Sequence, residues 1–123
     1  MGLITKHFEL AVQHQPAANT VATISVAADA AARIVCKSLT ASVAGTAASG
    51  LVTVNLRDGA AGAGTILMSK VLICAANGTA SWELSDLNIA GTKNTAMTLE
   101  FDAAGGASTE ETVAFSYYKE GEV

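Results

Sequence analysis

Residues 51–58 read LVTVNLRD, and apolar side chains fall at every second position within them. Val52, Val54 and Leu56 would share one face of an extended strand, with Thr, Asn and Arg on the other face. Residues 95–102, TAMTLEFD, show the same alternation of Met, Leu and Phe with Thr, Glu and Asp. A repeat of two residues is typical of a β-strand that buries one face. Both segments therefore predict strands whose apolar faces cover a core.

Five further segments are rich in β-branched or alternating residues and end near Gly, Ala or Asn: residues 20–27, 33–43, 65–75, 79–84 and 111–118. Residues 65–75 fit one long strand, or two strands joined by a bend near Ser69-Lys70. The chain then has seven or eight short strands at the spacing of all-β folds. Alanine also favours helices, but Val, Ile and Thr crowd the same segments and no helical repeat survives. We expect an all-β fold, an antiparallel β-sandwich or barrel.

The dipeptide Asn77-Gly78 is the strongest local signal. Asn and Gly both tolerate positive φ, which a type I′ hairpin turn requires at two successive positions. We therefore expect a hairpin between a strand that ends near Ala75 and a strand that starts at Thr79.

The two ends of the chain differ from the alternating centre. Residues 1–19 include bulky and polar side chains without turn chemistry, so we expect an N-terminal arm. This arm would either add to the sandwich as an edge strand or lie on a neighbouring molecule. Residues 20–118 hold the sandwich, and residues 119–123, KEGEV, are expected to form a charged C-terminal tail.

The charge of the chain argues against nucleic acid as a direct partner. Seven Lys and Arg against eleven Asp and Glu give a net charge of −4, with no basic stripe. The alanine-rich residues 22–48 are interrupted by Asp29, Arg33 and Lys37, so they fall short of the ~20 apolar residues of a membrane span. The first residues lack the basic start and apolar run of a secretory signal. We expect no direct nucleic-acid contact and no membrane partner.

The two cysteines, Cys36 and Cys74, are too few for a disulfide framework and too far apart for a metal-binding pair. We expect two buried thiols, with a single cross-strand disulfide as the alternative.

The ionisable side chains show no grouping typical of catalysis. His7 and His14 lie in the arm, with no Cys or carboxylate at metal-ligand spacing. Glu100 and Asp102 share one strand face, which we expect to be solvated, and Glu110-Glu111 is expected to be surface charge. We therefore predict that the chain is not an enzyme and holds no cofactor or metal.

Residues 59–65, GAAGAGT, have the glycine content of a phosphate-binding loop but not its spacing, and no Lys precedes Thr65. The segment lies between strands and opens no helix, so no helix N-terminus would face an anion. We expect a mobile loop.

The aromatic residues Trp82, Tyr117 and Tyr118 are candidates for core anchors or for contacts. A lone Trp in a strand fits either a core or edge anchor, or a contact in a protein interface. Tyr117 and Tyr118 are consecutive, so we expect Tyr117 to be buried and Tyr118 to point outward.

Three stretches and a final aromatic strand carry a family resemblance: PAANTVATISVAADAAARIVCKSLTASV, GLVTVNLRDGAAGAGTIL and NGTASWELSDLNIAGTKNTAMTLEFDAA. Over about residues 16–118 the chain resembles the small capsid cement (decoration) proteins of tailed bacteriophages. The similarity lies in overall texture and in short strings such as V-x-L-R-D-G, T-I-L and A-M-T-L-E-F. No functional residue can be carried over from it.

The resemblance implies a jelly-roll or β-sandwich fold and a structural role on the outer surface of a virion, after synthesis in the host cytoplasm. It implies binding to the major capsid protein and a homo-oligomer, a dimer or trimer, on the shell. The candidate contacts with the capsid or with other copies are His7, Phe8, His14, Trp82 and Tyr118. An N-terminal arm would suit strand addition to a coat subunit.

The alternative is a head-fibre or tail module that recognises host surface carbohydrate. Such a module would need outward aromatic side chains grouped on one surface, so Trp82 and Tyr118 would have to come together.

Overall fold

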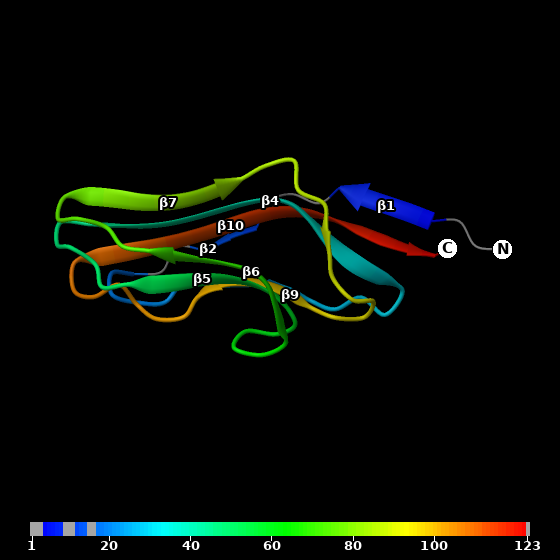
Figure 1. Ribbon diagram of the computed structural model, residues 1–123. Coiled ribbons are helices and arrows are strands. Elements are labelled where there is room, and N and C mark those ends of the chain that lie inside the picture. The colour runs from blue at the N-terminus through cyan, green and yellow to red at the C-terminus, as the bar shows by residue number, and fades with distance from the viewer. Residues whose placement is uncertain (1–3, 9–11, 15–16, 123) are drawn as a thin grey trace.

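The computed structural model describes residues 4–8, 12–14 and 17–122, with residues 4–8, 12–14 and 122 described by their backbone alone (Figure 1). Strands make up all the regular structure in these ranges: β1 Ile4–Phe8, β2 Val12–His14, β3 Thr23–Val26, β4 Ala32–Gly45, β5 Val52–Asp58, β6 Thr65–Leu72, β7 Gly78–Leu84, β8 Ile89–Ala90, β9 Met97–Phe101 and β10 Thr109–Glu122. In this described part of the chain, no helix has the length and hydropathy needed to cross a bilayer.

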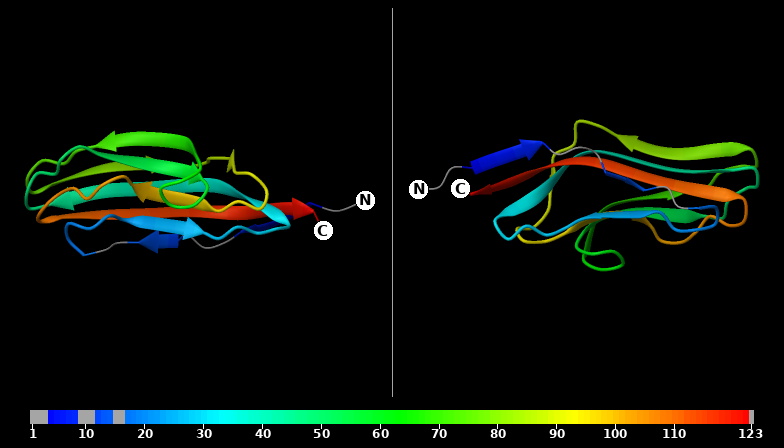
Figure 2. Two further views of the ribbon diagram at one scale, coloured as in Figure 1. Left: turned by 90° about the horizontal axis from the view of Figure 1, so that it is seen from below. Right: turned by 180° about the vertical axis from the view of Figure 1, so that it is seen from behind.

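The strands form two antiparallel sheets that face each other (Figure 2). The β4 sheet has the order β2-β10-β4-β7, with β1 also paired to β10 and β8 to β4, and the β5 sheet has the order β3-β9-β5-β6. Without β1 and the very short β8, eight strands remain. Among them β2 pairs with β10, β3 with β9, β4 with β7 and β5 with β6, so each pair lies inside the one before it in the sequence. This nested pairing is that of a jelly roll. The expected antiparallel sandwich of jelly-roll type is confirmed.

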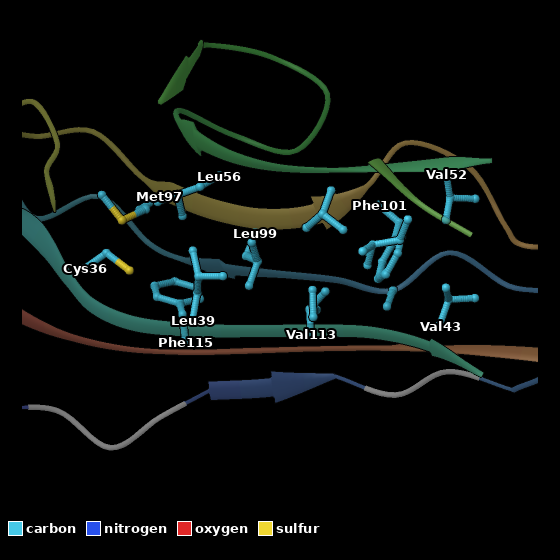
Figure 3. Close-up of a cluster of buried hydrophobic side chains, with 14 of the residues drawn as sticks. Cys36, Leu39, Val43, Val52, Leu56, Met97, Leu99, Phe101, Val113 and Phe115 are labelled. Atoms are coloured by element: carbon cyan, nitrogen blue, oxygen red, sulfur yellow. The ribbon is translucent and has the colours of Figure 1, made fainter. Parts of the chain in front are cut away.

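Alternate side chains from both sheets fill the interior (Figure 3). In β5, Val52, Val54 and Leu56 are at most 1% exposed, so the alternation predicted for residues 51–58 is confirmed. Burying an aliphatic side chain of this size stabilises a fold by about 1.5–3 kcal/mol. β9, the neighbour of β5 in the same sheet, adds Met97, Leu99 and Phe101, and the opposite sheet supplies Leu39 and Val43 from β4 and Val113 and Phe115 from β10.

The Asn77-Gly78 turn does not form a hairpin. Asn77 has a φ of 56°, whereas Gly78 does not have the positive φ that a type I′ turn also needs there. β6 pairs with β5 and β7 pairs with β4, so the turn carries the chain from one sheet to the other. The predicted hairpin is wrong because β4 offers β7 a long-range partner with a buried inner face, which outweighs the local turn preference.

The C-terminal residues form a strand and not a tail. β10 continues to Glu122, and its last residues pair with β4 on one side and with β1 on the other (Figure 2). Two of the charged residues have partners there: Glu120 forms an ion pair with Arg33, and Lys119 Nζ lies 3.5 Å from Asp29 Oδ2. The described parts of the N-terminal segment, β1 and β2, pair with β10 of the same chain. This pairing agrees with the first of the two alternatives for the arm, an edge strand added to the sandwich.

Cys36 and Cys74 are both buried and unpaired, at opposite ends of the sandwich. The backbone carbonyl of Cys74 accepts a hydrogen bond from Ser49 N–H, and Ser49 follows the end of β4 at Gly45. Cys36 lies nine positions before Gly45 on that strand. Nine extended residues span about 30 Å, far beyond the reach of a disulfide. Burial raises the pKa of the Cys36 thiol to about 11, which keeps it protonated at neutral pH.

Glu111 is a carboxyl inside the sandwich and not the surface charge expected from the sequence. It shares the inner face of β10 with Val113 and is 1% exposed. Its Oε1 accepts a hydrogen bond from Ala22 N–H at 3.0 Å, and no described group donates to its Oε2. Burial raises the pKa of Glu111 to about 7; the Ala22 bond lowers it somewhat, and the Asp102 carboxylate raises it further.

This carboxyl makes the stability of the fold depend on pH. The pKa of Glu111 rises from 4.5 in the unfolded chain to about 7 in the folded chain. The contribution of its protonated form to the free energy of unfolding is therefore full below pH 4.5 and is lost as the pH rises through about 7. Glu111→Gln keeps an oxygen acceptor for Ala22 but cannot ionise. We expect the variant to be more stable than the unchanged chain by about 2–3 kcal/mol at pH 8, with the difference shrinking toward zero at pH 4. Urea denaturation across this pH range measures it, and a pH-independent difference would contradict the prediction.

Candidate interaction surface

Three aliphatic side chains lie exposed at one end of the outer face of the β5 sheet. Leu51, Val71 and Ile73 are 71%, 55% and 56% exposed. Val71 lies opposite Thr53 across the β5–β6 ladder, and the same register, continued past Val52, sets Leu51 opposite Ile73. We call Leu51, Val71 and Ile73 the aliphatic patch.

The patch exists because apolar residues run consecutively here and do not alternate. Residues 71–74 read VLIC, and Leu72 and Cys74 take the inner-face positions. Their neighbours must then point outward. Such a cluster of exposed aliphatic side chains is a candidate site of association. The apolar run in residues 65–75 predicts a strand, but it does not reveal by itself which side chains stay exposed.

The other end of the same face is polar and covered. Glu100 in β9 is 8% exposed, and its Oε1 lies 2.7 Å from Arg57 Nε and accepts a hydrogen bond from Gly62 N–H at 2.8 Å. The expectation that Glu100 is solvated is wrong, because Arg57 and the loop of residues 59–64 cover it. Asp102 is exposed, as expected, and accepts a hydrogen bond from a backbone N–H of β5.

The loop of residues 59–64 is tied to the sheet by hydrogen bonds, in contrast to the mobile segment expected from its composition. Gly59, Gly62 and Gly64 have φ values of 151°, 71° and 80°, which favour glycine. The Gly59 carbonyl accepts a hydrogen bond from the buried Thr98 hydroxyl at 2.8 Å, and Gly62 N–H binds the Glu100 carboxylate. Two hydrogen bonds to β9 therefore hold the loop over the polar end of the face.

Lys70 protects the open edge of β6. It lies opposite Val54, whose side chain points into the core, so Lys70 occupies an inner-face position and yet is exposed. A further strand added beside β6 would bury this ammonium group, which is costly. A further strand is therefore not expected to extend the β5 sheet beside β6.

Trp82 and Tyr118, two of the predicted contact residues, lie far apart. Trp82 is opposite Ala41 on β4 and is half-buried, packed against the core from the inner face of β7. Tyr118 is opposite Val35, six positions away along β4. Six extended residues span about 20 Å, so the two aromatic side chains do not form one binding surface.

Tyr118 is buried, although its place on the outer face agrees with the strand alternation. It is only 6% exposed. Its hydroxyl donates a hydrogen bond to Asn88 Oδ1 at 3.0 Å, and Lys37 Nζ lies 6.0 Å from the ring centroid. The expectation of an outward contact is wrong for this residue, because neighbouring polar side chains cover its ring.

The other three predicted contacts, His7, Phe8 and His14, lie in β1 and β2. Their side chains lie outside the described residues, so their role stays a prediction.

The remaining ionisable side chains are dispersed. Among the side chains of residues 17–121, no three of His, Cys, Asp or Glu gather closely enough to hold a metal ion. Two open surface hollows each contain one carboxylate, from Glu110 in one and Glu83 in the other.

No protein-family model matches the chain, and no curated protein matches it. Among solved structures, a protein from the Bacillus endospore appendages, described as disulfide-linked pili, aligns with 100% of this chain and 91% of its own, at 18% identity and a TM-score of 0.41. A CBM4 structure aligns over 93% and 77%, at 7% identity and a TM-score of 0.48. The coat protein of Tobacco streak virus aligns over 91% and 85%, at 8% identity and a TM-score of 0.35.

These likenesses are too distant to support an argument about function. The assignment of the fold as a jelly roll rests on the strand order of the chain itself.

Two glycine substitutions test whether the loop of residues 59–64 is fixed. A Cβ at Gly64 would lie 2.3 Å from the Asp58 carbonyl oxygen, whereas a Cβ at Gly62 meets nothing within 4 Å. Gly62→Ala should cost about 1 kcal/mol for its left-handed backbone. Gly64→Ala carries the same cost and a backbone clash, so we expect at least twice the loss of stability. Urea denaturation measures both, and equal losses would show that the loop adapts freely.

Proposed function

We propose that this chain is a structural virion protein that binds the outside of a tailed-bacteriophage capsid and stabilises it by bridging subunits of the major capsid protein. The aliphatic patch is the observation that supports the proposal. Together with the resemblance of the sequence to capsid cement proteins, it suggests a protein that acts by burying surface against other polypeptides.

The patch is suited to a protein partner. Removing exposed aliphatic surface from water contributes about 25 cal/mol per Å², and Leu51, Val71 and Ile73 are each more than half exposed. Asp102 accepts a hydrogen bond from the backbone of Thr53, which lies opposite Val71, and it is exposed, so it could meet a Lys or Arg of the partner at the rim. Such a contact is small for one copy, but attachment to several subunits at once would raise the overall affinity greatly.

Carbohydrate binding receives less support. A sugar-binding face needs aromatic rings presented together to solvent, and the described aromatic candidates are separated by about 20 Å. The aliphatic patch offers dispersion contacts but few of the hydrogen-bonding groups that sugar hydroxyls require.

Charge substitutions in the patch test the proposal by co-sedimentation with empty capsids of the phage that encodes the chain. Val71→Asp and Ile73→Asp would each place a carboxylate in the buried contact, so we expect at least a tenfold loss of capsid binding. Both positions are exposed, so the variants should keep their stability within about 0.5 kcal/mol.

Ile66→Asp is the matched control. Ile66 is 47% exposed on the same strand but lies beside the glycine loop, at the other end of β6. We expect this variant to bind as well as the unchanged chain. Equal binding by all three variants would contradict the proposed contact, and a glycan-array signal that depends on Trp82 would favour the carbohydrate alternative.

A further inference from the structure

β7 presents an open edge of the β4 sheet. The strand runs from Gly78 to Leu84 and pairs with β4 along its whole length. In the described part of the chain, no strand pairs with its other edge, which lies at the margin of the molecule (Figure 1). Its backbone groups on that side are therefore available to another strand.

The side chains of β7 alternate strictly. Ala80, Trp82 and Leu84 occupy the inner face and are only half-buried against the core, while Thr79, Ser81 and Glu83 are exposed on the outer face. A strand added beside β7 would complete the burial of the inner-face residues, Trp82 above all.

The edges of the β5 sheet, β6 and β3, are less suited to strand addition. β6 carries Lys70 on its inner face, as described above, and β3 is only four residues long. β7 has no such protection, because its single charge, Glu83, points outward and would stay in solvent after pairing. Open edges of soluble proteins are usually protected by a charge or a proline unless a partner covers them.

We propose that the partner of this edge is a second copy of the chain, paired antiparallel through β7 about a two-fold axis at Ser81. Ser81 is the midpoint of Gly78–Leu84, so this is the register in which all seven residues of both strands pair. A two-fold axis brings the same patch of each copy together, which requires the strand to be complementary to itself.

The sequence of β7 meets this requirement in size. In the proposed register Trp82 of each copy lies opposite Ala80 of the other, and Leu84 lies opposite Gly78. On the inner face every large side chain therefore faces a small one, and the bulky groups do not collide. Cross-strand packing of this kind is the unit that stabilises a sheet.

The sequence also meets the requirement in charge. Glu83 lies opposite Thr79 of the second copy, and Ser81 lies opposite itself, so no like charges meet. The dimer would join the two β4 sheets into one continuous sheet and leave the aliphatic patch of each copy uncovered. If the proposed function holds, the dimer would present two capsid-binding patches; the strand pairing itself does not depend on that function.

Site-specific crosslinking tests the register. Facing residues of an antiparallel pair have Cα atoms about 4.5–5.5 Å apart, within the range of a disulfide. Ser81→Cys should therefore give a covalent dimer on mild oxidation. Thr79→Cys is the matched control, since it is equally exposed but lies about 13 Å from its counterpart in this register. Cys36 and Cys74 are buried and should not compete.

Lysine substitutions at the same two positions test the energetics by sedimentation equilibrium. Ser81→Lys sets two ammonium groups side by side at the axis, so the dimer dissociation constant should rise about fivefold or more. Thr79→Lys meets Glu83 of the second copy and should leave dimerisation unchanged or tighten it. Circular dichroism checks that each variant is folded.

The outcomes separate clearly. A disulfide dimer of Ser81→Cys alone, with selective weakening by Ser81→Lys, supports the proposal. A chain that is monomeric at all concentrations and fails to crosslink, or equal effects at positions 79 and 81, would overturn it. Crosslinking at neither position in a dimeric protein would place the dimer interface elsewhere and would also overturn it.

Discussion

The antiparallel ladder between β4 and β10 is the contact on which the rest of the fold depends. Both strands are fourteen residues long, and they pair from Thr109–Gly45 at one end to Gly121–Ala32 at the other. Their inner faces supply one wall of the core, and their free edges accept β1 and β2 on one side and β7 and β8 on the other. The β5 sheet closes over this wall, and the aliphatic patch and the β7 edge are surfaces of the resulting sandwich.

Most of the strands could be predicted from the sequence. A strand that buries one face has an apolar residue at every second position, and this repeat can be recognised within the segment itself. The turn at Asn77 could not be interpreted correctly in this way, since the choice between hairpin and sheet-crossing connection depends on β4, more than thirty positions earlier. The burial of Glu111 and Glu100 was also beyond a local pattern. Glu111 continues the inward alternation of β10 where an apolar residue is expected, and Glu100 is covered by a loop that folds back to it.

The exposed side chains, too, could be predicted only in part from neighbouring residues in the sequence. An unbroken apolar run such as residues 71–74 indicates that some aliphatic side chain must face outward, but only the register with β5 shows that Leu51 joins Val71 and Ile73. Trp82 fitted both a core anchor and a contact residue, and its half-buried place on an edge strand is compatible with both roles. Tyr118 is covered by two residues distant in sequence: Asn88 accepts a hydrogen bond from its hydroxyl, and Lys37 lies over its ring.

In the function proposed above, the aliphatic patch at one end of the β5 sheet is buried against another polypeptide. Hydrogen–deuterium exchange of the chain, alone and bound to capsids, measures this burial. Exchange should slow on binding at residues 51–53 and 71–74 and stay unchanged in the loop of residues 59–64. Slower exchange confined to other parts of the chain, with these two segments unaffected, would contradict it.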